Sequence, residues 1–430
     1  MIRVPKPPSS WTCIEDSDRV CEVDLRILYL HQYFSTRAGT AGTRSYEFAR
    51  HLVREGHEVA VVTGLSDRTT IADCAEASSG LISRNALDGI EVVVLGIRYS
   101  NEMSHLRRMV SFGMFPLLAT WAGLTVGKLD LVLATSTPLT IGVPGYVVSR
   151  LRRVPFVFEV RDLWPEAPVA LGVLKNRVLI GVAGWAEAFF YAKAHTVIAV
   201  TKGIHDTLRH RGIPEAKLEL ITHGADVDLF KPSPKNNAVR AELGLQGKFV
   251  AGYTGAHGLA NGLNIVIEAA RLMRDHPDVI LLLMGDGAHK ANLVRLAEEY
   301  GLENVIFLDP RPRSQMPEVL AAIDLCLQIL KNVPYFEKAC PNKLFDYLAA
   351  GRPVLVNLPG EVQRMLEDSG AGIFVQPDDP HGMAQAILEL KANPTRCAEM
   401  GRKARELAMD FAREKQAQKL ESVLRSVVQE

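Results

Sequence analysis

The sequence carries no surplus of charge of either sign. Its 430 residues include 49 Lys and Arg against 49 Asp and Glu, and 47% are hydrophobic. A chain with zero net charge and this apolar content collapses, which excludes disorder as the main state. The balance also disfavours a dedicated nucleic-acid binder, because such proteins carry a basic surplus that displaces counterions from phosphates. At about 150 residues per domain, the length predicts two or three domains.

Cysteine pairs and an apolar leader are missing as well. The six cysteines, at positions 13, 21, 74, 326, 340 and 397, form no C-x-x-C pair, and no histidine is spaced to complete a zinc site. Scattered thiols of this kind are typical of a reducing compartment. Residues 1–24 contain no apolar run of signal-peptide length, so we expect a flexible tail on a cytoplasmic protein.

The dinucleotide fingerprint G-x-G-x-x-G is also absent. Gly39 and Gly42 lack the first glycine, and no acidic residue ends the following strand to bind a ribose, which makes an NAD-dependent dehydrogenase a weak interpretation. The sequence instead has three glycine-rich turns, each where a strand gives way to a helix. Backbone N–H groups and the helix dipole favour an anion there, although each turn alone fits an ordinary tight turn. The candidate anion-binding residues in these turns are Gly39, Gly42, Gly255, His257, Gly258, Gly285, Asp286 and Gly287.

Short β-rich apolar runs alternate with helical patterns from Leu25 almost to the end of the chain, which is typical of parallel sheets with helices on both faces. The alternation breaks at 231–247, where a Lys-, Pro- and Asn-rich segment predicts a linker, and then restarts. We therefore predict an α/β protein with two doubly wound Rossmann-like domains, at 25–235 and 236–410. A helix at 411–430 is expected to pack back toward the first domain. Open α/β sheets place ligands at their carboxyl ends, so the two domains should face one another across a cleft.

The segment from Cys340 to Val354 is the most informative in the chain. Pro341 can open a helix without losing a hydrogen bond, and the free amides of Asn342 and Lys343 then point toward whatever precedes the helix. Lys343 adds a full positive charge. Asp346 follows one turn later, close enough to the helix start to accept hydrogen bonds from a diol such as ribose. The alternative is a charged helix face with a cap.

From about Leu25 to its end, the chain resembles the GT-B glycosyltransferases of family 4. The resemblance is carried by Gly39–Thr43, Gly56–Val59, His223–Phe230, Gly285–Gly287, Asn304–Phe307 and Asn342–Pro353. It implies transfer of a sugar from a nucleotide donor with retention of anomeric configuration and without an obligatory metal. The site would lie between an N-terminal acceptor-binding domain and a C-terminal nucleotide-sugar-binding domain. The donor, a UDP-sugar by family habit, is a substrate, and no cofactor is expected.

Three departures from the family pattern define a variant site. The Arg and Lys that usually grip the donor diphosphate are Ala256 and Asn261 here, and Asn261 stays in the predicted donor set. The paired glutamates reduce to Asp346, with Lys338 at the first position and Glu337, one residue away, as a candidate sugar contact. The usual catalytic His is Arg161. All three departures occur together in a subgroup that resembles bacterial transferases of O-antigen, capsule or colanic-acid synthesis, typified by N-acetyl-fucosamine transferases.

The catalytic groups of such a site are expected to be positive, because the leaving nucleoside diphosphate gains negative charge as the glycosidic bond breaks. His257 and the helix N-termini would assist, and one of two acids would orient or deprotonate the acceptor hydroxyl. Alternatively, these acids simply pair with the neighbouring arginine. Asp226-x-Asp228 spells the D-x-D of metal-dependent transferases but falls in the family's pre-linker turn, so no metal site is predicted. The predicted catalytic residues are Arg161, Asp162, Glu166 and Lys343.

One segment bears on a membrane. Met109–Val126 has 18 consecutive uncharged residues, a length that would allow a membrane span, but Pro116 and two glycines weaken that interpretation. A buried or half-buried helix of the first domain is the main expectation. The alternative is that this helix, Val173–Tyr191 and the basic cluster Arg150–Arg153 form a surface for an anionic membrane. Such a surface would suit a lipid-linked acceptor.

The leading hypothesis is therefore a metal-independent glycosyltransferase that moves a sugar to a lipid-linked saccharide in cell-surface polysaccharide synthesis, in the cytoplasm or on the inner face of the membrane. Nucleic acid is not an expected partner. The same two-domain cleft would serve a sugar-nucleotide epimerase or a phosphorylase, although no Lys is placed to suggest a pyridoxal cofactor. A non-catalytic nucleotide-binding scaffold is a third hypothesis, and the missing Arg, Lys and Glu favour it.

Overall fold

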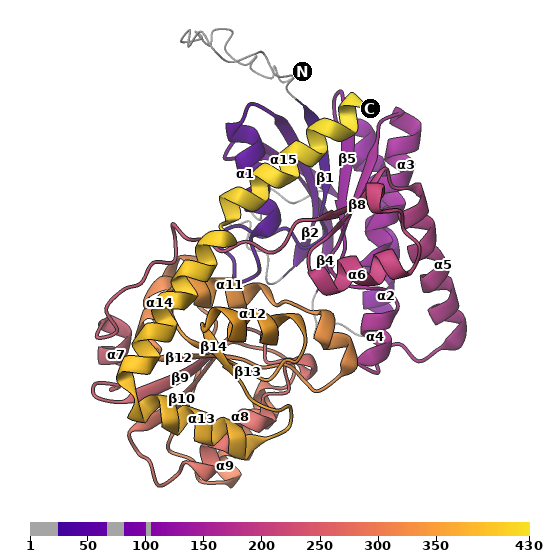
Figure 1. The fold of residues 1–430 in the computed structure, drawn as a ribbon. Coiled ribbons are helices and arrows are strands. Elements are labelled where there is room, and N and C mark those ends of the chain that lie inside the picture. The colour runs from indigo at the N-terminus through magenta and orange to yellow at the C-terminus, as the bar shows by residue number, and fades with distance from the viewer. Residues whose placement is uncertain (1–24, 67–80, 100–104) are drawn as a thin grey trace, which may run out of the picture.

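The computed structural model describes residues 25–66, 81–99 and 105–430. The tail predicted at 1–24, with Cys13 and Cys21, lies outside the described residues, as does Cys74. The described chain forms two α/β domains, one above the other in Figure 1, each built on its own sheet. The predicted fold class is therefore confirmed.

The first domain contains an eight-stranded sheet with the order β3-β4-β2-β1-β5-β6-β7-β8. All neighbouring strands are parallel except β3 and β4, which are antiparallel. Strands such as β5 and β6 are buried along their whole length because helices cover both faces of the sheet, and their residues are mostly apolar. The strands are β1 (Arg26–Leu30), β2 (Glu58–Ser66), β3 (Ile82–Leu87), β4 (Ile90–Tyr99), β5 (Leu131–Thr135), β6 (Phe156–Val160), β7 (Thr196–Ala199) and β8 (Leu218–Leu220).

Helices connect these strands. α1 is amphipathic and buries Tyr46, Phe48 and Leu52 on the side that faces the sheet, while α6 begins at the side-chain cap of Thr201. The helices of the first domain are α1 (Arg44–Arg54), α2 (His105–Thr125), α3 (Gly142–Arg152), α4 (Glu166–Ala170), α5 (Arg177–Lys193) and α6 (Lys202–His210).

Residues 109–125 of the uncharged segment Met109–Val126 lie in α2, a half-buried helix of the first domain. Phe115, Ala119 and Ala122 are fully buried against the sheet, whereas Leu117 and Trp121 are 70% and 59% exposed. Among the helices of residues 25–66, 81–99 and 105–430, none has the length and apolar character needed to span a bilayer. The expectation of a half-buried helix is thus confirmed.

The second domain has a six-stranded, all-parallel sheet with the order β11-β10-β9-β12-β13-β14. Its strands are β9 (Phe249–Thr254), β10 (Val279–Met284), β11 (Val305–Leu308), β12 (Leu325–Gln328), β13 (Val354–Val356) and β14 (Gly372–Phe374). Its helices are α7 (Ala238–Glu242), α8 (Asn264–Leu272), α9 (Lys290–Glu299), α10 (Met316–Ala322), α11 (Asn342–Ala349), α12 (Glu361–Ser369), α13 (Pro380–Ala392) and α14 (Pro394–Asp410), and α15 (Arg413–Gln429) closes the chain.

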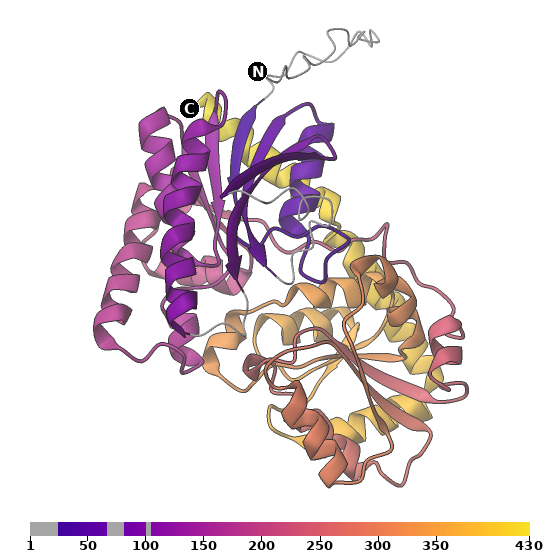
Figure 2. The same cartoon turned by 180° about the vertical axis from the view of Figure 1, so that it is seen from behind.

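The chain crosses between the domains twice, and the two crossings pair with each other. Ala225, on the way to the second domain, donates its N–H to Phe411 O at 2.7 Å, and Arg413 N–H donates to Ala225 O at 2.8 Å. After the return crossing, α15 runs diagonally up the first domain and lies beside α1 (Figures 1 and 2). Leu420 and Leu424 of α15 are buried in the same core as β1 and α1.

Charged hydrogen bonds fix α15 on α1. The His51 ring lies between two carboxylates of α15, with Nδ1 3.0 Å from Glu414 and Nε2 2.9 Å from Glu421. Glu421 also accepts from His57 Nε2 at 3.3 Å and from Arg425 Nε at 3.0 Å. Burial alone would raise the pKa of Glu421, but these hydrogen bonds hold it below its ordinary value.

The sequence analysis predicted neither β3 nor α12, because the hydrophobic pattern of both elements is weak. β3 is an edge strand in which no residue is fully buried, so its sequence Ile-Ser-Arg-Asn-Ala-Leu shows little apolar alternation. α12 buries only Val362 and Leu366 among nine residues, which leaves a stripe too narrow to stand out. β3 is the edge strand of the first sheet, whereas α12 begins at the domain interface, where Glu361 accepts from the N–H groups of Lys202 at 3.3 Å and Gly203 at 3.0 Å.

Replacing Glu421 with Gln should lower the free energy of unfolding by about 1–3 kcal/mol at neutral pH, since three charge-assisted hydrogen bonds lose their charged acceptor. A carboxylate whose pKa is lowered in the folded state stabilises above its unfolded pKa, about 4.3, and loses that effect as the pH falls. The difference in the free energy of unfolding between wild type and Glu421→Gln should therefore become smaller at acidic pH. Urea denaturation at several pH values measures it. Glu414→Gln, half exposed at 51%, is the control and should cost less than about 1 kcal/mol; equal losses would contradict the assignment.

Candidate active site

The carboxyl ends of the two sheets meet where the connection from β12 to α11 touches the first domain. Lys338 Nζ donates to Glu166 Oε1 at 2.7 Å, and the carbonyl of Lys338 accepts from Thr201 Oγ1 at 2.8 Å. Tyr335 accepts from Leu163 N–H at 3.1 Å. These contacts join the segment after β6 to the segment that precedes α11. The arrangement creates an interdomain pocket.

This interdomain pocket has a volume of about 320 Å³. Three of the residues predicted from the sequence line it, namely Arg161, Asp162 and Pro341. The volume lies at the lower end of the range for small-ligand sites, about 300–1,000 Å³. The other lining residues are Thr201, Ile204, His223, Leu330, Tyr335, Phe336, Lys338, Ala339 and Cys340.

α11 begins at the edge of this pocket. Pro341 is its N-cap, and no side chain caps the helix start. The first N–H groups of α11 are therefore available to an anion. Opposite them lies the loop after β1, because a Cβ on Gly42 would stand 3.4 Å from Asn342 Nδ2. The structure thus brings Gly42, Pro341 and Asn342 together from two domains.

Lys343 extends from this helix start toward the loop after β9. Its Nζ donates to Tyr253 Oη at 2.6 Å and lies 3.8 Å from the centre of the Tyr253 ring. A side chain at Gly255, where φ is +139°, would come within 2.6 Å of the same Nζ. Burial lowers the pKa of Lys343 to about 7, because the surrounding protein replaces water around the ammonium group. An incoming anion would restore a favourable partner for this charge.

The two glycine-rich turns of the second domain pack directly against each other. A Cβ on Gly285 would lie only 1.8 Å from Gly255 O, and one on Gly287 would lie 2.6 Å from His257 O. Glycine is needed at these positions for the close approach of the two backbones. His257 N–H donates to Asp286 O at 2.9 Å. The turns thus form one double loop at the carboxyl ends of β9 and β10.

His257 does not carry the positive charge that the sequence analysis gave it. The side chain is fully buried within the double loop, and neither ring nitrogen has a hydrogen-bond partner among the described residues. Burial, together with the charges of Lys290 and Lys343, lowers its pKa to about 4. The imidazole is therefore neutral at neutral pH. Of the expected cations, Lys343 and Arg161 remain.

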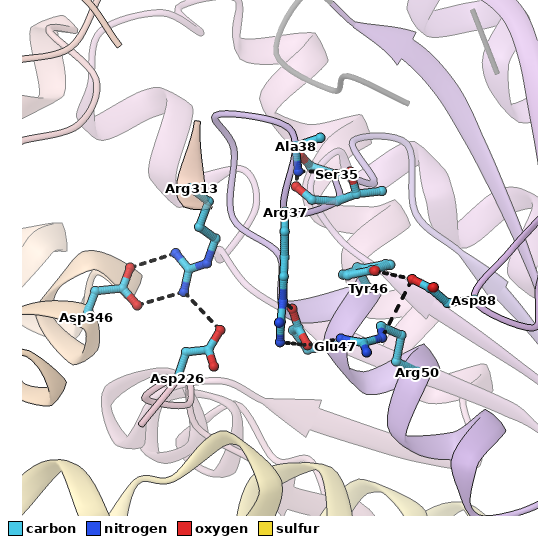
Figure 3. Close-up of polar contacts among 11 residues, drawn as sticks. Ser35, Arg37, Ala38, Tyr46, Glu47, Arg50, Asp88, Asp226, Arg313 and Asp346 are labelled. Atoms are coloured by element: carbon cyan, nitrogen blue, oxygen red, sulfur yellow. Dashed lines mark hydrogen bonds and ion pairs between the residues drawn. The ribbon is translucent and has the colours of Figure 1, made fainter. Parts of the chain in front are cut away.

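Asp346 is held by an arginine that the sequence analysis missed. Arg313 donates from two nitrogens to the two oxygens of Asp346, both at 2.8 Å, and its Nη2 lies 3.7 Å from Asp226 in the turn before the linker (Figure 3). The Arg313 guanidinium also lies 5.0 Å from the centre of the Phe230 ring. Asp346 was predicted to accept hydrogen bonds from a diol such as ribose, and in the structure Arg313 fixes the orientation of its carboxylate.

Arg313 lies five residues after the end of the strand β11, in the sequence Arg311-Pro312-Arg313. Its position after the carboxyl end of a strand is a signal that could have found it, whereas its pairing with Asp346 is a feature of the tertiary structure alone. Asp226, from the D-x-D sequence, faces this arginine. Among residues 25–66, 81–99 and 105–430, no three His, Cys, Asp or Glu side chains gather in a way that could hold a metal ion.

The loop after β1 is shaped by its own ion pair. Arg37 donates to both oxygens of Glu47 on α1, at 2.6 and 2.9 Å, and Ala38 N–H donates to Thr36 Oγ1 at 3.3 Å (Figure 3). Gly39 lies at the tip of this loop, and its carbonyl accepts from Arg313 N–H at 3.4 Å. The predicted residue Gly39 therefore contacts the second domain through its backbone.

Arg161 belongs to a buried charge cluster of the first domain. It donates to Glu159 Oε1 at 2.9 Å and to Ser45 Oγ at 2.8 Å, while Arg44 donates to Glu159 Oε2 at 2.9 Å. Burial alone would raise the pKa of Glu159, but the two arginines hold it well below its ordinary value. Two arginines against one carboxylate leave one net positive charge beside the pocket.

The acids of the loop after β6 are paired, but not with Arg161. Asp162 accepts from Thr137 Oγ1 at 2.7 Å and from Tyr335 Oη at 3.3 Å. Glu166 is bound by two cations, Arg211 at 2.8 Å and Lys338 at 2.7 Å. Asp162 lines the pocket and keeps no cationic partner among the described ion pairs, so the two predicted acids have different environments.

Two further predicted residues serve the structure of their own segments. Asn261 accepts from Gly258 N–H at 3.2 Å and so closes the loop after β9. Glu337 has an exposed side chain, and its carbonyl lies against Gly360, where a Cβ would come within 2.5 Å. The contacts of the described residues do not bring Glu337 to the pocket, which Lys338 lines instead.

Both halves of the chain match family models of glycosyltransferases. Residues 39–224 match the model described as "Glycosyl transferase 4-like domain", and residues 235–407 match "Glycosyl transferases group 1". Together with the two facing Rossmann-like sheets, these matches define the protein as a glycosyltransferase of the GT-B fold. More particularly, the chain belongs to the family 4 type of these enzymes.

Curated relatives support the same class. The chain is 24% identical over 391 residues to "Putative colanic acid biosynthesis glycosyl transferase WcaI" of Escherichia coli K12, which covers 86% of this chain and 94% of the relative. It is 23% identical to "Probable glycosyltransferase WbjE" of Pseudomonas aeruginosa, over 61% of this chain and 66% of that protein.

Solved structures show the same fold. Sucrose-phosphate synthase from Thermosynechococcus elongatus superposes with a TM-score of 0.73 at 19% identity, covering 94% of this chain and 98% of that one. Anabaena Alr3699/HepE, in complex with UDP and glucose, gives a TM-score of 0.69 at 21% identity, covering 94% and 100%.

The Arg313–Asp346 pair can be tested by a double-mutant cycle on stability. Arg313→Ala should lower the free energy of unfolding by about 3–5 kcal/mol, because Asp346 and Asp226 are left buried without their cation. The double variant Arg313→Ala/Asp346→Ala should lose less than the sum of the single variants, with a coupling of about 1–3 kcal/mol. Chemical denaturation measures both.

The exposed pair Arg295–Glu299, with side chains 64% and 52% exposed, is the matched control for this cycle. Its coupling should stay below about 1 kcal/mol. Strict additivity of the Arg313 and Asp346 substitutions would show that the two side chains do not interact.

Proposed function

We propose that this protein is a retaining, metal-independent glycosyltransferase that moves a sugar from a UDP-sugar to a lipid-linked saccharide in cell-surface polysaccharide synthesis. The observation that carries the proposal is the start of α11, where uncapped N–H groups lie opposite the loop after β1 and Lys343 extends toward the loop after β9. Backbone amides and one cation at the carboxyl ends of two facing sheets form an anion site suited to a diphosphate.

The chemistry asked of this site is stabilisation of a leaving nucleoside diphosphate. As the glycosidic bond breaks, negative charge grows on the diphosphate oxygens, and a cation fixed in advance lowers the energy of that state. Lys343 is held by Tyr253 in the described structure, and Arg161 contributes the net positive charge of its cluster on the other side of the pocket. Asp346, oriented by Arg313, is the proposed acceptor of hydrogen bonds from the ribose.

Asp162 is the proposed acceptor-orienting acid. It lines the interdomain pocket, and its described partners are the hydroxyls of Thr137 and Tyr335, so it can accept a hydrogen bond from a sugar hydroxyl. Glu166 is already held by Arg211 and Lys338. We therefore assign Glu166 to the joining of the two domains.

The choice of UDP and of a polysaccharide acceptor is supported by the relatives. HepE has been solved with UDP and with UDP-glucose, and WcaI is described as a colanic acid biosynthesis transferase. The three departures at Ala256, Asn261 and Arg161 fit the O-antigen, capsule and colanic-acid type of transferase, in which we place this chain. A cytoplasmic protein at the inner face of the membrane follows from that placement.

The proposal predicts release of UDP from a UDP-sugar only when a lipid-linked acceptor is present. Conversion of the donor without acceptor would indicate an epimerase instead, and tight UDP binding without turnover would indicate a scaffold. The assay uses several UDP-sugars with and without acceptor. Lys343→Ala should abolish transfer while thermal unfolding stays nearly unchanged; an active variant would remove Lys343 from this role.

The pH profile of the same assay is a signature of Lys343. An amine with a pKa of about 7 is charged below that pH and neutral above it, so kcat/KM for the donor should fall as the pH rises through about 7. In Lys343→Arg the guanidinium stays charged, and this decrease should disappear from whatever activity remains. Persistence of the decrease in Lys343→Arg would assign it to another group.

A membrane surface is supported by one flank of the first domain, where α2, α3 and α5 lie together (Figures 1 and 2). Its apolar side chains are exposed by more than half, and monomeric proteins rarely expose so many together. They are Leu117, Trp121, Leu151, Val178, Leu179, Val182 and Trp185. Two of the seven are tryptophans, the residue that favours the boundary between lipid and water.

Basic residues border this apolar flank. Arg150 and Arg153 stand at the end of α3, and Lys175 and Arg177 stand at the start of α5. All four are exposed, and none has an acidic partner in the ion pairs of the described chain. Unpaired cations around an apolar surface favour a bilayer with anionic headgroups, at about 1 kcal/mol per charge.

Vesicles that contain anionic phospholipid should carry the protein to the top of a density gradient at low salt, and high salt should reduce this. Trp185→Ser/Leu179→Ser should abolish flotation, because it removes two exposed apolar contacts without affecting the core. Met409→Ser, an exposed position on α14 of the second domain, is the control and should float like wild type. A wild-type protein that stays at the bottom with anionic vesicles would refute the surface.

A further inference from the structure

A second and larger cavity lies on the opposite side of the second sheet. Its volume is about 810 Å³, and it is lined by residues at the amino ends of the strands, such as Phe249, Asp324 and Pro353. The linker contributes Pro232 and Lys235. The carboxyl ends of the same strands carry the glycine-rich turns of the candidate active site. This cavity, called the rear groove below, is therefore separate from that site.

The acids of the rear groove are already paired. Asp278 binds Lys391 at 2.6 Å, and Asp324 binds both Lys235, at 2.8 Å, and Arg240, at 2.5 Å. The third acid, Glu406, is bound by Arg402. The lining contains six basic residues and three acidic ones, a net charge of +3. The electrostatic potential of the rear groove therefore favours an anion.

Three basic residues of the lining have no acidic partner in the described chain. Lys248 donates to Pro277 O at 2.6 Å, and Arg352 donates to Ser233 O at 2.7 Å. Arg405 donates only to backbone carbonyls, among them Ala349 O at 2.8 Å. Carbonyl groups satisfy hydrogen bonds but do not neutralise charge. An anionic ligand in the rear groove would neutralise the charge of these three residues.

Arg352 gives the most direct indication. Its Nε is buried and has no hydrogen-bond partner among the described residues, which is costly for a charged group. Burial lowers the pKa of Arg352, because the cationic form is held away from water. An oxyanion at this guanidinium would supply both the missing acceptor and the missing charge.

The remaining lining is apolar and can accept the uncharged part of a ligand. Pro232, Phe249, Pro353, Leu390 and Pro394 supply carbon surface around the cations. The volume falls within the range of small-molecule sites, about 300–1,000 Å³. We propose that the rear groove binds a phosphorylated small molecule, with its phosphate on Arg352 and Lys248 and its organic part against these apolar side chains.

The rear groove also contacts the elements that connect the two domains. Arg405 donates to Ala349 O, at the last turn of α11, and to Phe230 O and Val227 O in the turn before the linker. α11 begins at the candidate active site and ends at the rear groove. A phosphorylated ligand bound there would thus lie against the far end of the helix that carries Lys343.

Calorimetric titration of the full chain with inorganic pyrophosphate tests this proposal, with saturating UDP present to occupy the candidate active site. Binding that persists under UDP is expected. In Arg352→Gln and in Lys248→Gln it should weaken at least about tenfold, whereas Arg295→Gln, an exposed control on α9, should leave it unchanged. Lys343→Ala should not affect this binding, which separates it from the proposed transferase site.

Two results would overturn the proposal. One is that saturating UDP abolishes all pyrophosphate binding, and the other is that folded Arg352→Gln and Lys248→Gln proteins bind like wild type. Far-ultraviolet circular dichroism shows that the variants are folded. The hydrogen bond from the Lys248 amine to Pro277 O is exposed to solvent, so we expect Lys248→Gln to fold. This variant keeps the test valid if Arg352→Gln does not fold. If UDP does not bind at all, that result counts against the proposed function only. Pyrophosphate binding by wild type and by Arg352→Gln can still be compared without UDP.

Discussion

A single buried arginine joins the segments on which the candidate active site depends. Arg313 binds Asp346 of α11 through two hydrogen bonds, lies near Asp226 in the turn before the linker, and donates its backbone N–H to Gly39 of the first domain. A guanidinium has a fixed planar fork of donors, so it can set the relative positions of several acceptors at once. The side chain of Arg313 thus contacts α11 and the turn before the linker, and its backbone contacts the loop after β1.

The charged groups of the site leave a positive charge that a diphosphate would neutralise. Lys343 is desolvated and has a lowered pKa, while His257 is buried and neutral. On the opposite side, Arg44 and Arg161 share the single carboxylate of Glu159. The family's usual Arg and Lys are replaced by Ala256 and Asn261 here, but Lys343 and Arg161 supply other cations at the same interdomain surface. This compensation favours a working transferase over a degenerate scaffold.

The first domain is asymmetric in a way that suits an enzyme with a lipid-linked acceptor. On one side of it α15 packs against α1 and contacts the buried His51, and another side exposes the apolar flank of α2, α3 and α5 (Figures 1 and 2). The second domain has only scattered exposed apolar side chains, such as Leu259 and Met409. A membrane contact through the first domain would leave the second domain on the side of the soluble donor. The rear groove, also in the second domain, would then remain accessible to soluble ligands.

The sequence by itself determined the two-domain α/β fold, the glycine-rich turns and the start of α11. These features are local, because strand periodicity, helix caps and close backbone approach depend on neighbouring residues. Only the tertiary structure decided which charges meet. Asp346 binds Arg313 across 33 positions of the chain, Glu166 binds Lys338 across 172, and His257 is buried by a turn from the next strand. Such pairings depend on long-range packing, and burial then sets the pKa of each group, so no spacing in the sequence could reveal them.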